Sequence, residues 1–210
     1  MIAIVDYGRG NLGSVEKAFA RVGVPARVTQ DPRAVDEADA VVLPGDGAFH
    51  DAMENLERLG LLPSLRRALD GTRPFLGICL GYQLLFSTSE EFGEGRGLDV
   101  ISGAVRRFPL GGKVPHMGWN RVEHAGDLRL FEGVPSGAYF YFVHSYYPVL
   151  LGDTGERIGW CDYGIRFAAA LERGRLYATQ FHPEKSQRWG LRLLENFAAI
   201  VKSSAGNAAR

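Results

Sequence analysis

Short apolar runs alternate with amphipathic segments as far as residue 90, and this alternation restricts the possible folds more than any other feature. Residues 2–5 and 75–78 are apolar without alternation, as expected of strands covered on both faces of a parallel sheet. Two further strands are predicted at 26–29 and 40–43. Apolar residues at steps of three and four predict helices in between, over residues 11–22, 49–60, 62–69 and 80–86. The pattern predicts an α/β fold.

The second part of the chain has a different character, with short β-like runs between turns. Strands are predicted over residues 105–108, 138–143, 167–171 and 176–180, the last two joined by a hairpin loop at 172–175. Helically spaced apolar residues then predict a closing helix. We expect one domain over residues 1–202, followed by a flexible tail at 203–210.

The composition excludes several classes of protein. Lys and Arg number 24, and so do Asp and Glu, which gives a formal net charge of zero. We therefore expect neither nucleic acid nor a membrane as principal partner. Two cysteines in different surroundings argue against a disulfide framework and for a reducing compartment. No run of about 18 apolar residues occurs, and the apolar start is too short for a signal peptide, so we expect a cytoplasmic protein.

The sharpest local motif is Gly77-Ile78-Cys79-Leu80-Gly81, which places a cysteine between a predicted strand and a predicted helix. An elbow of this kind holds its central residue in strained geometry, and small residues two positions to either side avoid collisions. A helix N-terminus also favours a thiolate over a thiol. Cys79 is therefore a candidate nucleophile, the alternative being a buried structural cysteine. Cys161 has no such context and is expected to be structural.

A base for this thiolate is offered by Gln180-Phe181-His182-Pro183-Glu184, directly after a predicted strand. Residues two apart in an extended segment face the same side, so Glu184 can hydrogen-bond one ring nitrogen of His182 while the other addresses Cys79. Nucleophile, base and orienting carboxylate would then follow one another in the chain. Taken alone, His-Pro-Glu is also compatible with an ordinary loop.

A glycine-rich loop, Leu43-Pro44-Gly45-Asp46-Gly47, follows another predicted strand. Sites in parallel α/β sheets collect beyond the carboxyl ends of strands, so this loop can direct backbone N–H groups at an oxyanion beside Cys79. An ordinary strand-to-helix turn is the alternative. Gln83, one helical turn after Cys79, is a candidate substrate contact. The five histidines and two cysteines show no zinc-type spacing, and we expect neither a metal nor a cofactor.

These motifs resemble those of the class I, or triad-type, glutamine amidotransferases. The resemblance rests on Gly77-Ile78-Cys79-Leu80-Gly81-Tyr82-Gln83 and His182-Pro183-Glu184. It implies a flavodoxin-like sandwich with a mostly parallel central sheet, helices on both faces and added short β-strands in the second half. It also implies glutamine hydrolysis through a thioester on Cys79, with His182 moving protons and Glu184 holding its ring.

Within this family, the sequence is most similar to the glutaminase subunits of imidazole glycerol phosphate synthase, an enzyme of histidine biosynthesis. The supporting motifs are Asp6-Tyr7-Gly8-Arg9-Gly10-Asn11, Pro44-Gly45-Asp46-Gly47-Ala48-Phe49, Pro115-His116-Met117-Gly118-Trp119-Asn120, Phe142-Val143-His144-Ser145-Tyr146-Tyr147 and His182-Pro183-Glu184-Lys185-Ser186. The resemblance implies that ammonia passes through a (β/α)8-barrel cyclase subunit to a ribonucleotide. The products would be imidazole glycerol phosphate and an aminoimidazole carboxamide ribonucleotide.

The same resemblance implies roles outside the triad. The residues expected around the oxyanion and the glutamine are Gly45, Asp46, Gly47, Leu80, Gln83, His144, Ser145 and Tyr146. Those expected to face the barrel are Asn11, Met117, Trp119 and Lys185. Asp46 departs from the family, which often has an apolar residue such as Val there. Because the family uses the backbone N–H of this residue, that role can survive, although a charge beside a forming oxyanion can lower the rate.

Three other functions compete with this one. A glutaminase that feeds another synthase, such as that of pyridoxal phosphate or anthranilate, would not explain Pro-His-Met-Gly-Trp-Asn. A binding or regulatory subunit that had lost its chemistry would lack a triad member, and none is missing. A cysteine peptidase on a related fold would lack the His-Pro-Glu pair. The family resemblance further implies that the chain is nearly idle without its partner.

Overall fold

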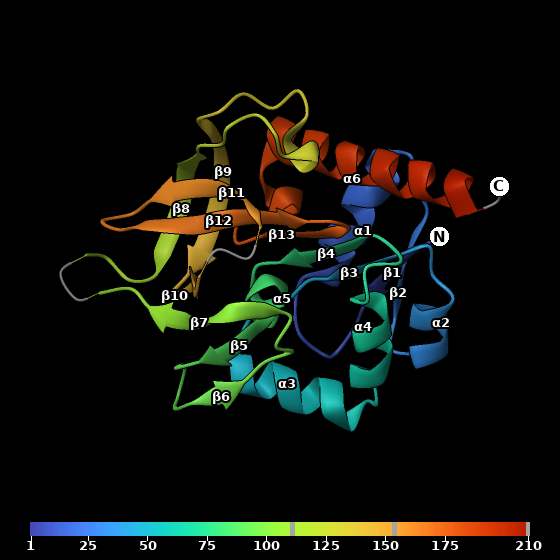
Figure 1. Cartoon of the computed structure of the whole chain (residues 1–210), viewed down its shortest axis with the longest axis horizontal. Helices are drawn as coiled ribbons and strands as arrows, with labels where there is room; N and C mark the ends of the chain where they lie inside the picture. Colours follow the sequence, from blue (N-terminus) through green and yellow to red (C-terminus); the bar gives the residue numbers. More distant parts are fainter. Residues whose placement is uncertain (110–111, 153–154, 209–210) are drawn as a thin grey trace.

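A seven-stranded sheet forms the centre of the protein in the computed structural model, which describes residues 1–109, 112–152 and 155–208. Its strands are β1 (Ile2–Val5), β2 (Ala26–Thr29), β3 (Ala40–Leu43), β4 (Phe75–Ile78), β11 (Arg157–Asp162), β12 (Arg166–Arg173) and β13 (Leu176–Thr179). The order is β11-β12-β13-β4-β3-β1-β2 (Figure 1). The five strands from β13 to β2 run parallel, whereas β12 and β11 add an antiparallel edge. Every residue of β1, β3, β4 and β13 is buried, which explains their apolar sequences.

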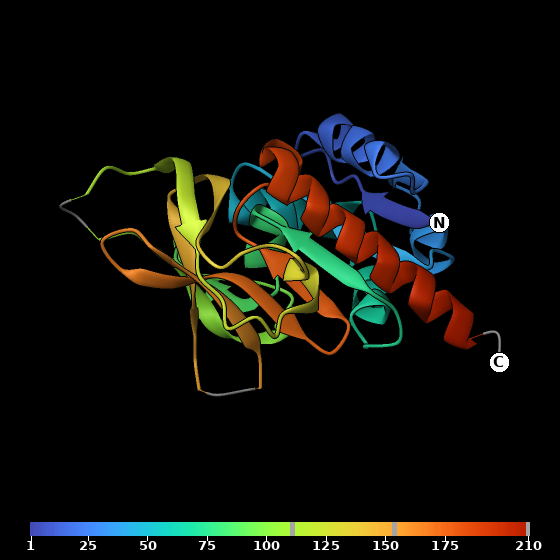
Figure 2. The same cartoon turned by 90° about the horizontal axis from the view of Figure 1, so that it is seen from above.

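Helices cover both faces of this sheet (Figures 1 and 2). On one face lie α1 (Leu12–Arg21) and α6 (Gln187–Ala208), joined by a contact between the rings of Phe19 and Phe197. On the other lie α3 (Phe49–Arg58) and α4 (Leu62–Ala68), whose apolar residues belong to a second core. This arrangement confirms the predicted α/β fold with a mostly parallel sheet.

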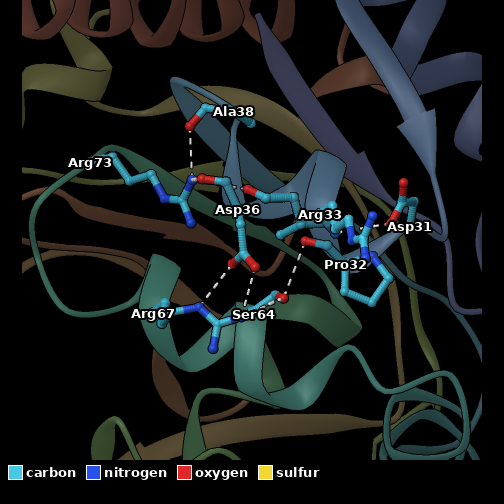
Figure 3. A network of polar contacts seen from close by, with 9 residues as sticks. Asp31, Pro32, Arg33, Asp36, Ala38, Ser64, Arg67 and Arg73 are labelled. Carbon is cyan, nitrogen blue, oxygen red and sulfur yellow. Dashed lines mark hydrogen bonds and ion pairs between the residues drawn. The ribbon is translucent and has the colours of Figure 1, made fainter.

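A short helix that the sequence pattern does not predict, α2 (Pro32–Asp36), is attached to α4 by polar contacts (Figure 3). Asp31 caps its start by accepting a hydrogen bond from the backbone N–H of Arg33. The Asp36 carboxylate accepts two hydrogen bonds from the Arg67 guanidinium, at 3.0 and 2.7 Å. Arg73 donates to the backbone carbonyls that end the helix, including that of Ala38 at 2.8 Å.

The middle of the chain, from residue 86 to residue 150, adds a smaller β-region. A four-stranded sheet has the order β10-β7-β5-β6, and a two-stranded antiparallel ribbon consists of β8 and β9. The bounds are β5 (Phe86–Ser89), β6 (Gly95–Arg96), β7 (Ile101–Arg107), β8 (His116–Val122), β9 (Ala138–His144) and β10 (Tyr146–Leu150). Two single-turn helices complete the described elements, η1 (Arg129–Phe131) and η2 (Pro183–Lys185).

Two predictions about helices need correction. The helix predicted over residues 80–86 is only α5 (Leu80–Gln83), and Phe86 already belongs to β5. The helix stops because the carbonyls of Leu84 and Leu85 accept hydrogen bonds from the backbone of residues 98, 100 and 101. At the other end of the chain, α6 continues through residue 208, so the segment expected to be a tail from residue 203 is helical that far. Residues 209 and 210 lie outside the described part.

Candidate active site

Cys79 lies at the junction of β4 and α5, and its backbone has the strained conformation that the elbow motif predicts, with a φ of 54°. Its N–H donates to the carbonyl of Thr179 on the neighbouring strand at 2.7 Å. A side chain at Gly81 would place its Cβ 1.8 Å from the Leu43 carbonyl oxygen, so only glycine fits beside the elbow. Because α5 has only four residues, its dipole offers less support to a thiolate than the predicted longer helix would.

His182 and Glu184 form the pair that their spacing predicts. The Nδ1 atom of His182 lies 2.8 Å from Oε1 of Glu184, and both side chains are almost fully buried. Burial lowers the pKa of His182, but the charges of Cys79 and Glu184 outweigh this effect and raise it to about 10. The other ring nitrogen, Nε2, is buried without a hydrogen-bond partner in the described ranges. The His182 ring, held by Glu184, therefore lies within electrostatic range of the candidate nucleophile.

The glycine-rich loop lies beside the nucleophile. In its present conformation, the backbone N–H expected to bind the oxyanion already donates a hydrogen bond to this loop. The N–H of Leu80 donates to the carbonyl of Gly45 at 3.4 Å, so that this carbonyl stands in front of a donor the oxyanion would need. The Asp46 carboxylate is tied elsewhere, because its Oδ1 accepts a hydrogen bond of 2.9 Å from the backbone N–H of Gly10. The acidic side chain is therefore directed to the loop before α1.

A pocket of about 250 Å³ opens above Cys79. Its lining includes seven of the other residues expected from the sequence, namely Asp46, Gly47, Leu80, Gln83, His144, Ser145 and Tyr146. Gly45, His182 and Glu184 are not among the lining residues. The ring of His144 is buried and donates from Nδ1 to the Tyr146 carbonyl at 2.7 Å, so it holds the pocket wall. Burial lowers the pKa of His144 to about 3, and its ring is neutral.

Glu91 also lines the pocket, and sequence reasoning missed it. Its carboxylate accepts a hydrogen bond of 2.8 Å from the N–H of Phe49, at the start of α3. Burial raises the pKa of this carboxyl group. Its position in a Glu-Glu-Phe-Gly turn gives no periodic signal, so only the fold shows that Glu91 lines the same pocket as Cys79.

The four residues expected to face a partner are all exposed. Met117 and Trp119 lie on β8 with 58% and 45% of their surface accessible, while His116, on the same strand, is buried. Asn11 caps α1, and Lys185 belongs to η2. The elements α1, η2, β9 and β8 adjoin in that order, which links the three elements that carry or adjoin these residues.

The remaining candidate groups stand apart from this site. Cys161 is buried on β11, and burial raises the pKa of its thiol to about 12. Within the described ranges, no three His, Cys, Asp or Glu residues are placed to hold a metal ion. No helix in the same part of the chain has both the length and the apolar character needed to cross a bilayer.

Comparison with known proteins gives one family. Residues 3–201 match the family described as glutamine amidotransferase class-I. A curated relative from Moorella thermoacetica, "Imidazole glycerol phosphate synthase subunit HisH", is 53% identical over 99% of this chain and 98% of the relative. Proteins of the same name from Aquifex aeolicus and Methanothermobacter thermautotrophicus are each 50% identical, over 92% and 97% of this chain and 94% and 100% of their own.

Solved structures agree on the fold. A putative GMP synthase subunit from Thermoplasma acidophilum superposes with a TM-score of 0.75 at 23% identity, covering 100% of this chain and 97% of that one. The glutaminase domain of CTPS from Trypanosoma brucei superposes with a TM-score of 0.68 at 18% identity, covering 96% of this chain and 93% of that one.

Proposed function

Because the chain belongs to the class I glutamine amidotransferase family, we propose that it hydrolyses glutamine at Cys79 as the glutaminase subunit of an imidazole glycerol phosphate synthase. The observation that carries the chemistry is the buried His182–Glu184 pair, 2.8 Å apart, in the field of a strained cysteine. Relatives of that name, about half identical over nearly the full chain, support the choice of synthase.

In the first half-reaction, the Cys79 thiolate attacks the carboxamide carbon of glutamine and forms a tetrahedral oxyanion. The C–N bond then breaks, the nitrogen leaves as ammonia with a proton from His182, and a γ-glutamyl thioester remains on Cys79. Glu184 accepts a hydrogen bond from Nδ1 and so directs the opposite nitrogen to the reaction.

In the second half-reaction, neutral His182 takes a proton from water, and the hydroxide oxygen attacks the thioester carbon. The C–S bond breaks, glutamate leaves, and the proton stays on His182 beside the regenerated thiolate. Reactants and products therefore balance as glutamine plus water giving glutamate plus ammonia.

The oxyanion requires a change in the glycine-rich loop. The Leu80 N–H is engaged by the Gly45 carbonyl, which would repel a developing negative charge at the same place. Rotation of the Gly45–Asp46 peptide releases this donor and turns the N–H of Asp46 towards Cys79. We infer that the chain is nearly idle in this conformation, in line with activation by a partner.

Substrate recognition follows from the pocket lining. Glutamine carries an α-ammonium group and an α-carboxylate besides the reacting amide. The Glu91 carboxylate suits the ammonium group, and the backbone around Ser145 and Tyr146 offers polar groups along the opposite wall. His144 fixes this wall by holding the Tyr146 carbonyl.

The partner in this proposal is a (β/α)8-barrel cyclase subunit, which receives the ammonia before it reaches bulk water. The exposed side chains of Met117 and Trp119 supply an apolar anchor for such an interface, and Asn11 and Lys185 supply polar contacts beside it. The two chains form a heterodimer.

The test is glutamate release from glutamine by the purified chain, alone and with a barrel cyclase subunit carrying its ribonucleotide ligand. We expect slow release alone, strong stimulation in the complex, and loss of both after Cys79→Ala. Activity without stimulation would point to another partner. Release that persists in Cys79→Ala, or silence in a complex shown to form, would contradict the proposed chemistry.

A further inference from the structure

The side chain of Gln180 lies against the sulfur of Cys79 and has no role in the chemistry described so far. Gln180 directly follows β13 and is fully buried. Its backbone N–H donates to the Ala169 carbonyl at 2.8 Å, which fixes its position beside β12. Its Nε2 atom is 3.7 Å from Cys79 Sγ. The question is which end of the amide faces the sulfur, because only the NH₂ end can stabilise a negative charge there.

Two neighbours settle this orientation. The backbone carbonyl of Tyr146 can only accept, so the atom of Gln83 that lies 2.9 Å from it is the amide nitrogen. The same nitrogen is 3.0 Å from the Gln180 side chain, which must therefore present its Oε1. The Nε2 of Gln180 then faces the sulfur. The reverse orientation would set two NH₂ groups against each other and a carbonyl oxygen against the thiolate.

The Tyr146 carbonyl is itself held from a second side. It accepts a hydrogen bond from Nδ1 of His144, whose Nε2 is left as an acceptor. His116 lies with Nδ1 at 3.0 Å from that nitrogen and donates to it. The Tyr146 carbonyl, which determines the orientation of both glutamine amides, is therefore held by the buried ring of His144, and this ring is held in turn by His116. Each donor faces an acceptor at every step from His116 to Cys79.

We propose that Gln180 is a further catalytic residue, whose side-chain N–H donates to the Cys79 sulfur and stabilises the thiolate in both half-reactions. The role of this thiolate rests on the function proposed above. This N–H stabilises the negative charge on the sulfur while His182 transfers protons. Gln83 and Tyr146 hold the Gln180 side-chain amide in the orientation that this hydrogen bond requires. One consequence concerns Gln83: both of its amide hydrogens are engaged, so it offers only Oε1 to the substrate and binds an N–H group of glutamine.

The decisive experiment measures alkylation of Cys79 by iodoacetamide as a function of pH, resolved from Cys161 by peptide mass spectrometry. Gln180→Met keeps the volume and removes the donor. We expect the pH of half-maximal alkylation to rise by about one pH unit, a tenfold change in the thiolate equilibrium. We also expect kcat for glutamate release to fall about tenfold, with KM for glutamine nearly unchanged. Because alkylation needs no glutamine turnover, it tests this role even if the proposed function fails.

Asn196→Leu is a matched control, because Asn196 is another buried amide, which donates to the carbonyls of Leu130 and Glu132 away from the sulfur. Its alkylation profile should equal that of the unaltered chain. An unchanged profile in Gln180→Met, or an equal shift in both variants, would overturn the proposal.

A second measurement uses the unaltered sequence and so does not depend on the folding of a Gln180 variant. In ¹⁵N-labelled protein, the Gln180 side-chain amide signals should shift with pH at the midpoint of Cys79 alkylation, and this shift should vanish in Cys79→Ala. Amide signals that do not respond to pH in the unaltered chain would contradict a hydrogen bond to the thiolate.

Discussion

The carboxylate of Asp46 accepts a hydrogen bond of 2.9 Å from the backbone N–H of Gly10, and this contact ties the glycine-rich loop to the segment before α1. Asn11, which follows Gly10, is one of the residues proposed to meet the cyclase subunit. The same loop presents the Gly45 carbonyl to the Leu80 N–H. A side chain whose charge was expected to disturb the oxyanion therefore fixes the loop in its resting conformation.

Asp46→Val should raise glutamate release by the isolated chain. The substitution removes the hydrogen bond to Gly10, and a net loss of about 1 kcal/mol in the resting conformation corresponds to a roughly fivefold gain in rate. Asp46→Asn keeps an acceptor at this position and should change the rate less. Steady-state glutamate release without the partner measures both. A Val variant no faster than the unaltered chain would show that the contact does not hold the loop.

Trp119→Ala should weaken assembly with the cyclase subunit without changing glutamate release by the isolated chain. Exposed aromatic residues of this kind often contribute about 2 kcal/mol to binding, which predicts a roughly thirtyfold higher concentration for half-maximal stimulation. Leu151→Ala removes another exposed apolar side chain, just after the end of β10, and should have no such effect. Titration of each variant with the liganded cyclase distinguishes them, and equal behaviour would remove Trp119 from the interface.

Stability should fall in mild acid because of two buried histidines. Burial lowers the pKa of His116 to about 4 and that of His144 to about 3. Below the ordinary histidine value of about 6.5, the unfolded chain takes up protons that the folded chain does not, so stability decreases as pH falls from there towards 4. Urea unfolding between about pH 7 and pH 4.5 measures this slope. His116→Gln should flatten it, and an unchanged slope would refute the assignment.

Tyr7→Phe should stabilise the fold. The Tyr7 hydroxyl is buried and has no hydrogen-bond partner among the residues that the structure describes, so its removal relieves a cost of about 1 kcal/mol. Tyr82→Phe is the matched control, because the hydroxyl of Tyr82 donates to the Ala168 carbonyl at 3.4 Å and its loss should not stabilise. Thermal unfolding compares the two. A lower Tm for Tyr7→Phe would mean that this hydroxyl is paired in solution.

The parts of the fold that could be predicted from the sequence are those in which local pattern and burial agree. The strands at residues 2–5, 26–29, 40–43 and 75–78 have the predicted bounds, because they are short and set off by turns. The elbow and the His182–Glu184 pair were also accessible, since glycine spacing and a two-residue step dictate their geometry.

The parts that could not be predicted depend on contacts between distant segments. The apolar run after Gln83 continues a helical pattern. Its backbone carbonyls nevertheless accept hydrogen bonds from the segment at residues 98–101, so the helix ends and β5 begins. Glu91 reaches the pocket only because its carboxylate binds the start of α3, 42 positions away. The orientation of the Asp46 carboxylate is likewise set by a hydrogen bond from a backbone N–H 36 positions away. None of these interaction partners can be identified from the local sequence pattern.

The positive φ of Cys79 also has an evolutionary consequence. A residue other than glycine carries a conformational penalty of about 1 kcal/mol or more in such a backbone, and glycine at this position would relieve it. Selection for stability and selection for chemistry therefore oppose each other at residue 79. In a lineage released from the need to hydrolyse glutamine, this position should drift to glycine early, so a glycine here would mark a descendant that has lost the activity while keeping the fold.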